Sequence, residues 1–139
     1  MAAIRGDVGK IMFEASGGTE ADIGSLRSWS LEITKDTIET TKMGATFKTR
    51  IGGLIDGSGS CELLYDPTEG AAYQAFIDDI ITTGDPGDAL IELFPDANQS
   101  AKKISCAIII TNASYGATLG EVQIINISFE TNGTITSAI

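Results

Sequence analysis

Polar and apolar residues alternate along most of the chain, which is the pattern of β-strands that bury one face. Ile and Thr, which favour extended backbone, are frequent in the alternating segments. The clearest of these segments are 28–34, 47–52, 60–65, 104–110 and 125–130, and shorter strands are predicted at Lys10–Glu14 and Ala89–Phe94. A mainly β fold follows from this pattern.

One segment has helical spacing instead. Its apolar residues recur every three or four positions: Ala72, Tyr73, Phe76, Ile77 and Ile80. The run Asp66-Pro67-Thr68-Glu69 before it predicts an N-cap, a proline in the first turn and a capping box. Gly84 and Pro86 favour an end shortly afterwards. We therefore predict a helix over residues 66–83, packed against a sheet because its apolar stripe must be covered.

Together these elements predict a two-sheet β-sandwich or partly closed barrel with one flanking α-helix and a long inter-strand loop. The length of 139 residues corresponds to a single domain. Residues 1–25 are predicted to form an N-terminal arm and a glycine-rich connection, and residues 35–46 an extended polar loop. A connection that long in so small a domain is usually functional or disordered. The glycine cluster at 52–60 is interpreted as a tight Asp56-Gly57 turn between strands.

The chain is strongly acidic, and its charged residues are unevenly distributed along it. Nine Lys and Arg oppose nineteen Asp and Glu, for a net charge of -10, and the first fifty residues are neutral overall. This balance argues against a protein that grips nucleic acid, since phosphate contacts need a basic face. Cys106–Ile110 is the longest apolar run and the first residues carry no apolar stretch, so neither a membrane span nor a secretory signal is expected.

Candidate chemistry is sparse. The chain has no histidine, which removes Ser-His-Asp and Cys-His nucleophile systems and histidine metal sites. Cys61 and Cys106 lack metal-ligand spacing; buried free thiols or a single disulfide both remain open. Trp29 is interpreted as a core anchor because it shares a strand face with Leu31 and Ile33. No catalytic residue, cofactor site or metal site is predicted.

The order of features is more informative than any single motif. A strand with Trp29 precedes the long polar loop, and the run Gly53-Leu54-Ile55-Asp56-Gly57-Ser58-Gly59-Ser60 follows it. Tyr65-Asp66-Pro67 then leads into the single helix, and the closing strand ends in Ile127-Ser128-Phe129-Glu130-Thr131-Asn132-Gly133. From about residue 26 to residue 133 this order resembles the tail tube (major tail) proteins of tailed bacteriophages, which share a fold with the tube subunit of type VI secretion.

The resemblance implies a non-enzymatic structural protein of the virion tail, assembled in the cytoplasm of a host bacterium. Its copies are expected to close into hexameric rings that stack into a hollow tube, with DNA as a transient, non-adhesive cargo. The tail sheath, tape measure, tail terminator and baseplate proteins are possible partners. Pairing between copies would also cover the exposed edges of an isolated sheet, which are an aggregation liability.

Two sets of residues are singled out on this basis. Cationic and apolar residues for stacking lie in or beside the loop that reaches the adjacent ring: Lys35, Ile38, Lys42, Met43, Lys48 and Arg50. Four carboxylates on polar strand faces are proposed to line the lumen and repel DNA phosphates: Glu32, Asp56, Glu121 and Glu130. Two alternatives stay open: a tube subunit of type VI secretion or another injection machine, and, in a different class, a β-sandwich module that binds carbohydrate.

Overall fold

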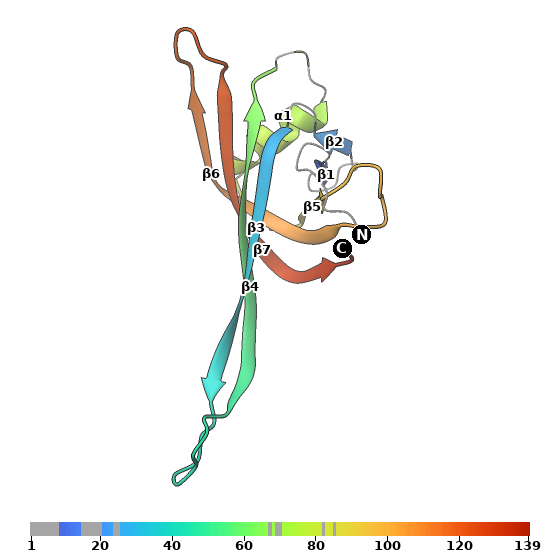
Figure 1. The fold of residues 1–139 in the computed structure, drawn as a ribbon. Coiled ribbons are helices and arrows are strands. Elements are labelled where there is room, and N and C mark those ends of the chain that lie inside the picture. Colours follow the sequence, from blue (N-terminus) through green and yellow to red (C-terminus); the bar gives the residue numbers. More distant parts are fainter. Residues whose placement is uncertain are drawn as a thin grey trace.

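The computed structural model describes residues 9–14, 21–23, 26–66, 68, 71–81, 83–84 and 86–139. Within these ranges the chain is mainly β with one short α-helix, as the sequence pattern predicts (Figure 1). The elements are β1 (Lys10–Glu14), β2 (Ala21–Ile23), β3 (Leu26–Glu39), β4 (Arg50–Leu64), α1 (Ala71–Asp78), the 3₁₀ helix η2 (Asp79–Ile81), β5 (Ala89–Phe94), β6 (Ile104–Gly116) and β7 (Ile124–Ser137).

The described strands form one open, fully antiparallel sheet rather than the two sheets of the predicted sandwich. The strand order is β2-β1-β5-β6-β7-β4-β3. The reason lies in β6 and β7, which are 13 and 14 residues long. The first part of β6 pairs with β5, and β6 also pairs with β7 over nearly its whole length, with register shifts near Ala107 and Thr111. Such irregularities let a strand bend and continue from one layer into the next.

The core lies inside this bent sheet and is closed by α1. Its fully buried side chains include Phe13 on β1, Leu63 on β4, Ile108 on β6 and Ile127 on β7, while β3 adds partly buried residues. Phe76 of α1 packs on Phe13 with ring centroids 4.9 Å apart, a tilted arrangement that aromatic pairs favour. Trp29 is half-buried against the same core, which agrees with its interpretation as an anchor.

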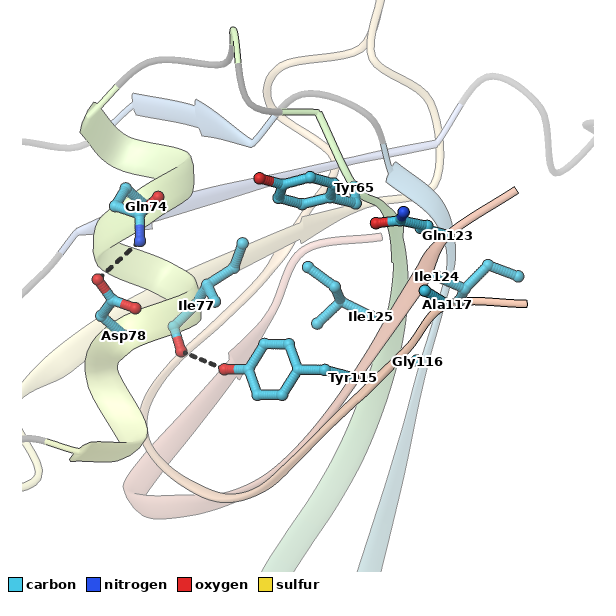
Figure 2. A pocket seen from close by; sticks show the side chains of 10 residues that line it. All are labelled: Tyr65, Gln74, Ile77, Asp78, Tyr115, Gly116, Ala117, Gln123, Ile124 and Ile125. Atoms are coloured by element: carbon cyan, nitrogen blue, oxygen red, sulfur yellow. Dashed lines mark hydrogen bonds between the residues drawn. The ribbon is translucent and has the colours of Figure 1, made fainter. Parts of the chain in front are cut away.

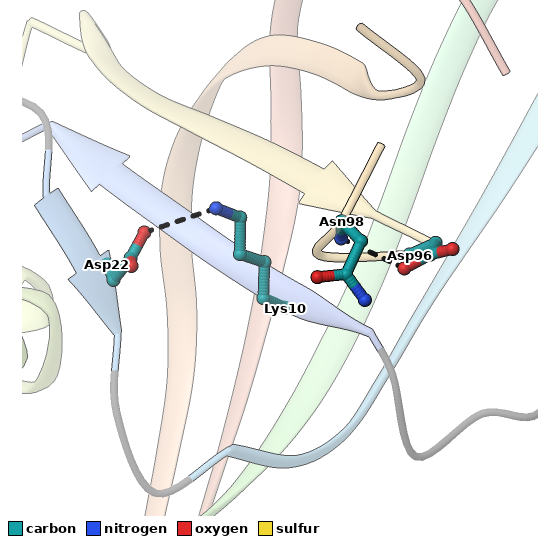
Figure 3. A network of polar contacts seen from close by, with 4 residues as sticks. All are labelled: Lys10, Asp22, Asp96 and Asn98. Atoms are coloured by element: carbon teal, nitrogen blue, oxygen red, sulfur yellow. Dashed lines mark hydrogen bonds and ion pairs between the residues drawn. The ribbon is translucent and has the colours of Figure 1, made fainter. Parts of the chain in front are cut away.

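The outer edge of the sheet is held by contacts around β1. Figure 3 shows Lys10 reaching Asp22 of β2, with Nζ 3.6 Å from the carboxylate. The same ammonium lies 4.7 Å from the centre of the Phe94 ring on β5, within the range of a cation–π contact. Asp96, in the turn after β5, accepts a hydrogen bond from the Asn98 amide at 2.9 Å. The two contacts of Lys10 tie β1 to both of its neighbours, β2 and β5.

The predicted bounds of the extended loop are wrong at both ends. Residues 35–39 continue β3, because Thr37 pairs with Gly52 and Ile38 with Ile51, so the connection covers residues 40–49. Threonine and isoleucine favour extended backbone, and a partner strand was available to them. The strand predicted from residue 47 accordingly begins later, at Arg50.

The glycine cluster is the middle of a strand, and the predicted turn at Asp56-Gly57 is wrong. β4 runs without interruption from Arg50 to Leu64. Its glycines serve close packing: a Cβ added at Gly59 would stand 2.5 Å from the Ser30 carbonyl oxygen and 2.6 Å from the Phe129 ring. A glycine inside a strand often marks such a close approach.

The helix is shorter than the predicted 66–83. α1 covers Ala71–Asp78 and tightens into η2. Asp66 Oδ1 accepts hydrogen bonds from the amide and the hydroxyl of Thr68, at 2.9 and 2.6 Å, so it forms a turn ahead of the helix. Pro67 and Glu69, the other parts of the predicted cap, lie outside the described residues. In the predicted connection at 1–25, residues 21–23 form β2 paired with β1, and most of the rest is outside the described ranges.

Candidate functional site

The half of the sheet that carries β3, β4, β7 and the end of β6 has one face turned away from the core. On β4 the buried Cys61 and Leu63 alternate with Ser58, Ser60 and Glu62. The strand register continues this alternation across the sheet in three rows: Glu32, Ser58 and Glu130; Ser30, Ser60, Ser128 and Asn112; Ser28, Glu62, Asn126 and Ser114. We call this surface the polar face. Apart from three carboxylates its residues are small and hydrophilic, and the row through Ser58 ends on β6 at the exposed Ile109.

Two of the four carboxylates singled out from the sequence lie in these rows, and a third, Asp56, lies just beyond them on β4. Glu32 and Glu130 both belong to the row through Ser58, and exposed Asp56 lies opposite Thr34, further along the face. Glu121 lies outside the rows, in the turn between β6 and β7, where it borders a hollow with Ser114 and Asn126. It therefore stands at one end of the polar face.

The three rows contain no lysine or arginine. Arg27, at the register shift where β3 begins, is the nearest cation in sequence to the rows, and its Nε lies 4.0 Å from Glu62. That pair neutralises the carboxylate of Glu62, while Glu32 and Glu130 form none of the ion pairs found between described residues. The polar face thus has a negative charge.

The outer part of the β3–β4 hairpin projects far from the rest of the molecule (Figure 1). We call residues 33–55 the arm. Seven large hydrophobic side chains are exposed on it: Ile33, Ile38, Met43, Phe47, Ile51, Leu54 and Ile55. Met43 is fully exposed and Phe47 is 82% exposed. An apolar surface of this kind marks a site of protein–protein contact.

The six residues singled out for stacking all belong to the arm. Lys35 and Ile38 lie on β3, Arg50 begins β4, and the loop between them holds the rest: Lys42, Met43 and Lys48. The loop is ordered by its threonines, since the Thr40 amide donates to the Thr49 carbonyl at 2.8 Å. The Thr49 amide in turn donates to Thr41 Oγ1 at 2.9 Å. The structure thus brings these six residues together on one projecting element.

A groove lies at the opposite end of the molecule, between α1 and the β6–β7 hairpin (Figure 2). Its volume is about 530 Å³, and its lining includes Tyr65, Ile77, Tyr115 and Ile124 together with Gln74 and Asp78. The Tyr115 hydroxyl donates to the Ile77 carbonyl at 3.4 Å, which joins β6 to the helix. We call this site the α1 groove. The sequence analysis did not predict this groove. Helical spacing at 72–80 identifies the face of the helix that is buried, but it does not show that the end of β6 lies beside that helix.

The four-stranded half of the sheet is flanked by two strand edges that have no partner among the described residues. β3 ends the sheet on one side and pairs with β4 alone. The end of β6 is the second edge, because its pairing with β5 stops at Ile108 while its pairing with β7 continues to Gly116. Both edges belong to the same four-stranded half of the sheet as the polar face. Unpaired edges of this length are a template for another chain.

Neither cysteine is a candidate nucleophile. Cys61 and Cys106 are buried free thiols, and burial raises the pKa of Cys61 to about 12 and that of Cys106 above its ordinary value. Both therefore stay protonated and unreactive at neutral pH. Across the described ranges, no three Asp, Glu or Cys residues gather in a way that could bind a metal ion. Nor does any helix there have the length and apolarity to cross a bilayer.

Comparison with known proteins gives a consistent result at the level of fold. No protein-family model and no curated protein matches the sequence. Among solved structures, the chain is similar to a subunit from the tail of an empty gene transfer agent particle with C6 symmetry. The TM-score is 0.78 and the sequence identity 16%, and the match covers 99% of this chain and 100% of that one. It is also similar to the SPP1 tail tube, with a TM-score of 0.71 and 14% identity over 99% of this chain and 81% of that one.

A third similar structure comes from the cap that terminates the tube of the anti-feeding prophage. Its TM-score is 0.68, with 16% identity over 99% of this chain and 93% of that one. These matches span nearly all of this chain and most or all of each neighbour. The chain therefore has the fold of subunits from phage-type tails and injection tubes, as the order of sequence features had indicated.

Proposed function

We propose that this protein is the structural subunit of a hollow tail tube, built from stacked six-membered rings of identical copies. The observation that carries the proposal is the full-length match in fold to a subunit of a tail with sixfold symmetry. Two properties of the chain itself support it. Its four-stranded half has two free edges, and its arm exposes an apolar surface that an isolated copy would leave in water.

Ring closure follows from the free edges. Successive strands in the order β3-β4-β7-β6 are antiparallel, so β3 and β6 run in opposite directions. The β3 edge of one copy can therefore pair with residues 110–116 of β6 in the next copy and continue the antiparallel ladder. Repeated around a sixfold axis, this contact closes a barrel with four strands from each copy. It also satisfies the backbone groups that each copy leaves unpaired.

Stacking of rings is the proposed task of the arm. The arm extends beyond the sheet at one end of the molecule, where it can reach the next ring (Figure 1). Contact with that ring would remove the seven exposed hydrophobic side chains from water. Lys35, Lys42, Lys48 and Arg50 add positive charge to the arm, while residues 51–139 carry the whole net charge of -10. Opposite charges on the two sides of this contact would favour one orientation of stacking.

The polar face is proposed to line the lumen. Glu32, Asp56 and Glu130 would form rings of carboxylates along the channel, with Glu121 at one end. Carboxylates repel DNA phosphates over about 8 Å at physiological salt, and small hydroxyl and amide groups offer no cation for the phosphates to bind. A genome could then slide without adhering. The tail sheath, tape measure, tail terminator and baseplate proteins are the further partners proposed, with assembly in the host cytoplasm.

A tube subunit of a protein injection machine is the second candidate. The fold similarity to the anti-feeding prophage cap favours it, since that structure terminates a tube. A carbohydrate-binding module has less support. It would need several exposed aromatic side chains on one face, yet Phe47 lies on the arm while Tyr65 and Tyr115 line the α1 groove at the far end.

Electron microscopy of the purified protein tests the proposal directly. We expect concentrated protein to form six-membered rings or hollow rods. Particles that remain monomeric at every concentration, measured by light scattering, would contradict it.

A shortened arm separates ring formation from stacking. Replacing residues 38–51 by the two-residue turn Asn-Gly joins Thr37 to Gly52, which already lie opposite each other. We expect this variant to fold and to form rings that do not polymerise. Long tubes from the shortened variant would show that the arm is not the stacking element.

Charge reversal in the lumen tests the last part of the proposal. The double variant Glu32→Lys with Glu130→Lys places cations on the polar face, and Glu32→Gln with Glu130→Gln is its matched neutral control. We expect both to form tubes, and the lysine variant to deliver much less DNA from complete particles because phosphates would bind to it. Equal delivery by all three proteins would refute a repulsive lumen.

A further inference from the structure

Exposed apolar residues are present at two opposite ends of the molecule. At one end is the tip of the arm, residues 40–49, and at the other are the β6–β7 turn and the α1 groove (Figure 1). Leu119 and Val122 of that turn are exposed, as are Tyr65 and Tyr115 beside the groove. Two complementary surfaces at opposite ends make a head-to-tail contact that does not close on itself, and repetition of that contact produces a filament.

The tip exposes two large apolar side chains, Met43 and Phe47, and a tight turn holds Met43 at its apex. The Ala45 amide donates to the Lys42 carbonyl at 3.1 Å, which closes a tight turn. Gly44 within that turn has φ +87°, a left-handed conformation that favours glycine. Met43 precedes this glycine and is fully exposed at the apex. An ordered turn loses little conformational entropy on binding, so the methionine is positioned for insertion.

The groove has the matching shape and chemistry. Its apolar lining comes from Tyr65, Ile77, Tyr115 and Ile124, and it is held open by contacts on both sides. The Tyr65 amide donates to the Gln123 carbonyl at 3.0 Å, which fixes the strand side. Gln74 donates to Asp78 at 2.8 Å, which places the Asp78 carboxylate at the groove (Figure 2). The groove is thus formed before any partner arrives.

The charges of the two ends are opposite. Residues 35–50 hold four cations, Lys35, Lys42, Lys48 and Arg50, against two carboxylates. The segments that surround the groove, residues 65–81 and 115–124, contain five carboxylates and no lysine or arginine. Among the groove-lining residues, Asp78 is the carboxylate. Complementary charge of this kind orients an encounter and suppresses the reverse one.

We infer that the α1 groove is the receptor for the arm of a second copy in the adjacent ring. Met43 of the arm occupies the apolar part of the groove, and Lys42 and Lys48 lie against Asp78. This inference rests on the proposed tube, and it assigns to that tube the surface that receives the arm. It also gives α1 a function beyond closing the core.

Charge reversal on each side, alone and combined, tests the contact. The tip variant carries Lys42→Glu and Lys48→Glu, and the groove variant carries Asp78→Lys. Matched controls are Lys102→Glu and Asp88→Lys, which reverse exposed charges outside both surfaces. Circular dichroism and gel filtration would verify that each variant folds and forms rings. The concentration at which tubes appear, measured by sedimentation, is the readout.

We expect the tip variant and the groove variant each to need at least about tenfold more protein to form tubes, because like charges would then meet. The controls should polymerise as the original protein does. Combining all three reversals in one chain should restore tubes. Mixing preformed rings of the two variants should give tubes in which the two kinds of ring alternate, since the tip of each variant is opposite in charge to the groove of the other.

Tubes formed by the groove variant at the original concentration would overturn the assignment of the groove while leaving the tube proposal intact. Failure of the unmodified protein to form rings or tubes would overturn both. To test the apolar part, Met43→Ser removes the inserted side chain without changing charge. We expect it to weaken stacking by a similar factor, and unchanged assembly would contradict insertion.

Discussion

Replacing Gly59 by alanine should destabilise the fold although it adds only one methyl group. Gly59 lies in β4, opposite Leu31 of β3 and Phe129 of β7. The new Cβ would stand 2.5 Å from the Ser30 carbonyl oxygen and 2.6 and 2.8 Å from two atoms of the Phe129 ring. Neither neighbour can yield easily, because the oxygen is part of a backbone and Phe129 is fully buried in the core.

The expected magnitude comes from two opposing contributions. Overpacking of this kind costs about 1–3 kcal/mol of unfolding free energy. Replacing glycine also restricts the unfolded chain, which returns about 0.4–1 kcal/mol. The net loss is therefore about 1–2 kcal/mol, which for a domain of this size lowers Tm by roughly 4–8 °C. Thermal melts followed by circular dichroism, at a concentration where copies do not associate, would measure it.

Gly116 provides the matched control. It lies at the end of β6, and a Cβ there would meet no heavy atom within 4 Å. Gly116→Ala should consequently leave stability unchanged or raise it by up to about 1 kcal/mol. The interpretation of Gly59 as a close-packing residue would be refuted if the two alanine variants melted at the same temperature.

Two further predictions concern the buried core. Because burial raises the pKa of Cys61 from 9.0 to about 12, the unfolded chain loses this proton first, so stability should fall as the pH rises from 9 to 12. The unfolding free energy of Cys61→Ala, measured by urea unfolding, should fall less steeply over this pH range. An identical slope in the two proteins would contradict the burial effect. Phe76→Ala should cost about 3–5 kcal/mol, because it removes the ring that packs 4.9 Å from Phe13. A loss below about 1 kcal/mol in the same assay would show that α1 is not fastened through this pair.

Local patterns in the sequence were sufficient to predict the strands that have one buried face and one exposed face. β1 and β5 have the predicted bounds, Lys10–Glu14 and Ala89–Phe94, because their apolar residues alternate and point into one core. Residues 35–46 of the arm were predicted as a polar loop because their hydrophobic residues do not alternate with the period of a half-buried strand. In the structure both sides of the arm are exposed, so periodic burial could not have revealed its strands.

The placement of the proposed site residues depended on register. Glu32 and Glu130 lie almost one hundred positions apart in the sequence, yet both belong to the row through Ser58. A shift of one residue in either pairing would have turned one of them toward the core. Their polar character was visible in the sequence, but their shared row was not.

The sequence by itself determined the fold class, the helix that precedes β5, the acidic balance and the cationic, apolar composition of the arm, because these depend on residue type and local spacing. The tertiary structure alone decided that the strands form one open sheet, that the glycine cluster is the middle of β4, and that α1 and the β6–β7 hairpin enclose a groove. These features depend on contacts between residues distant in sequence, such as Gly59 with Phe129 and Tyr115 with Ile77. Contacts of that kind follow from how the whole chain packs, and no local pattern encodes them.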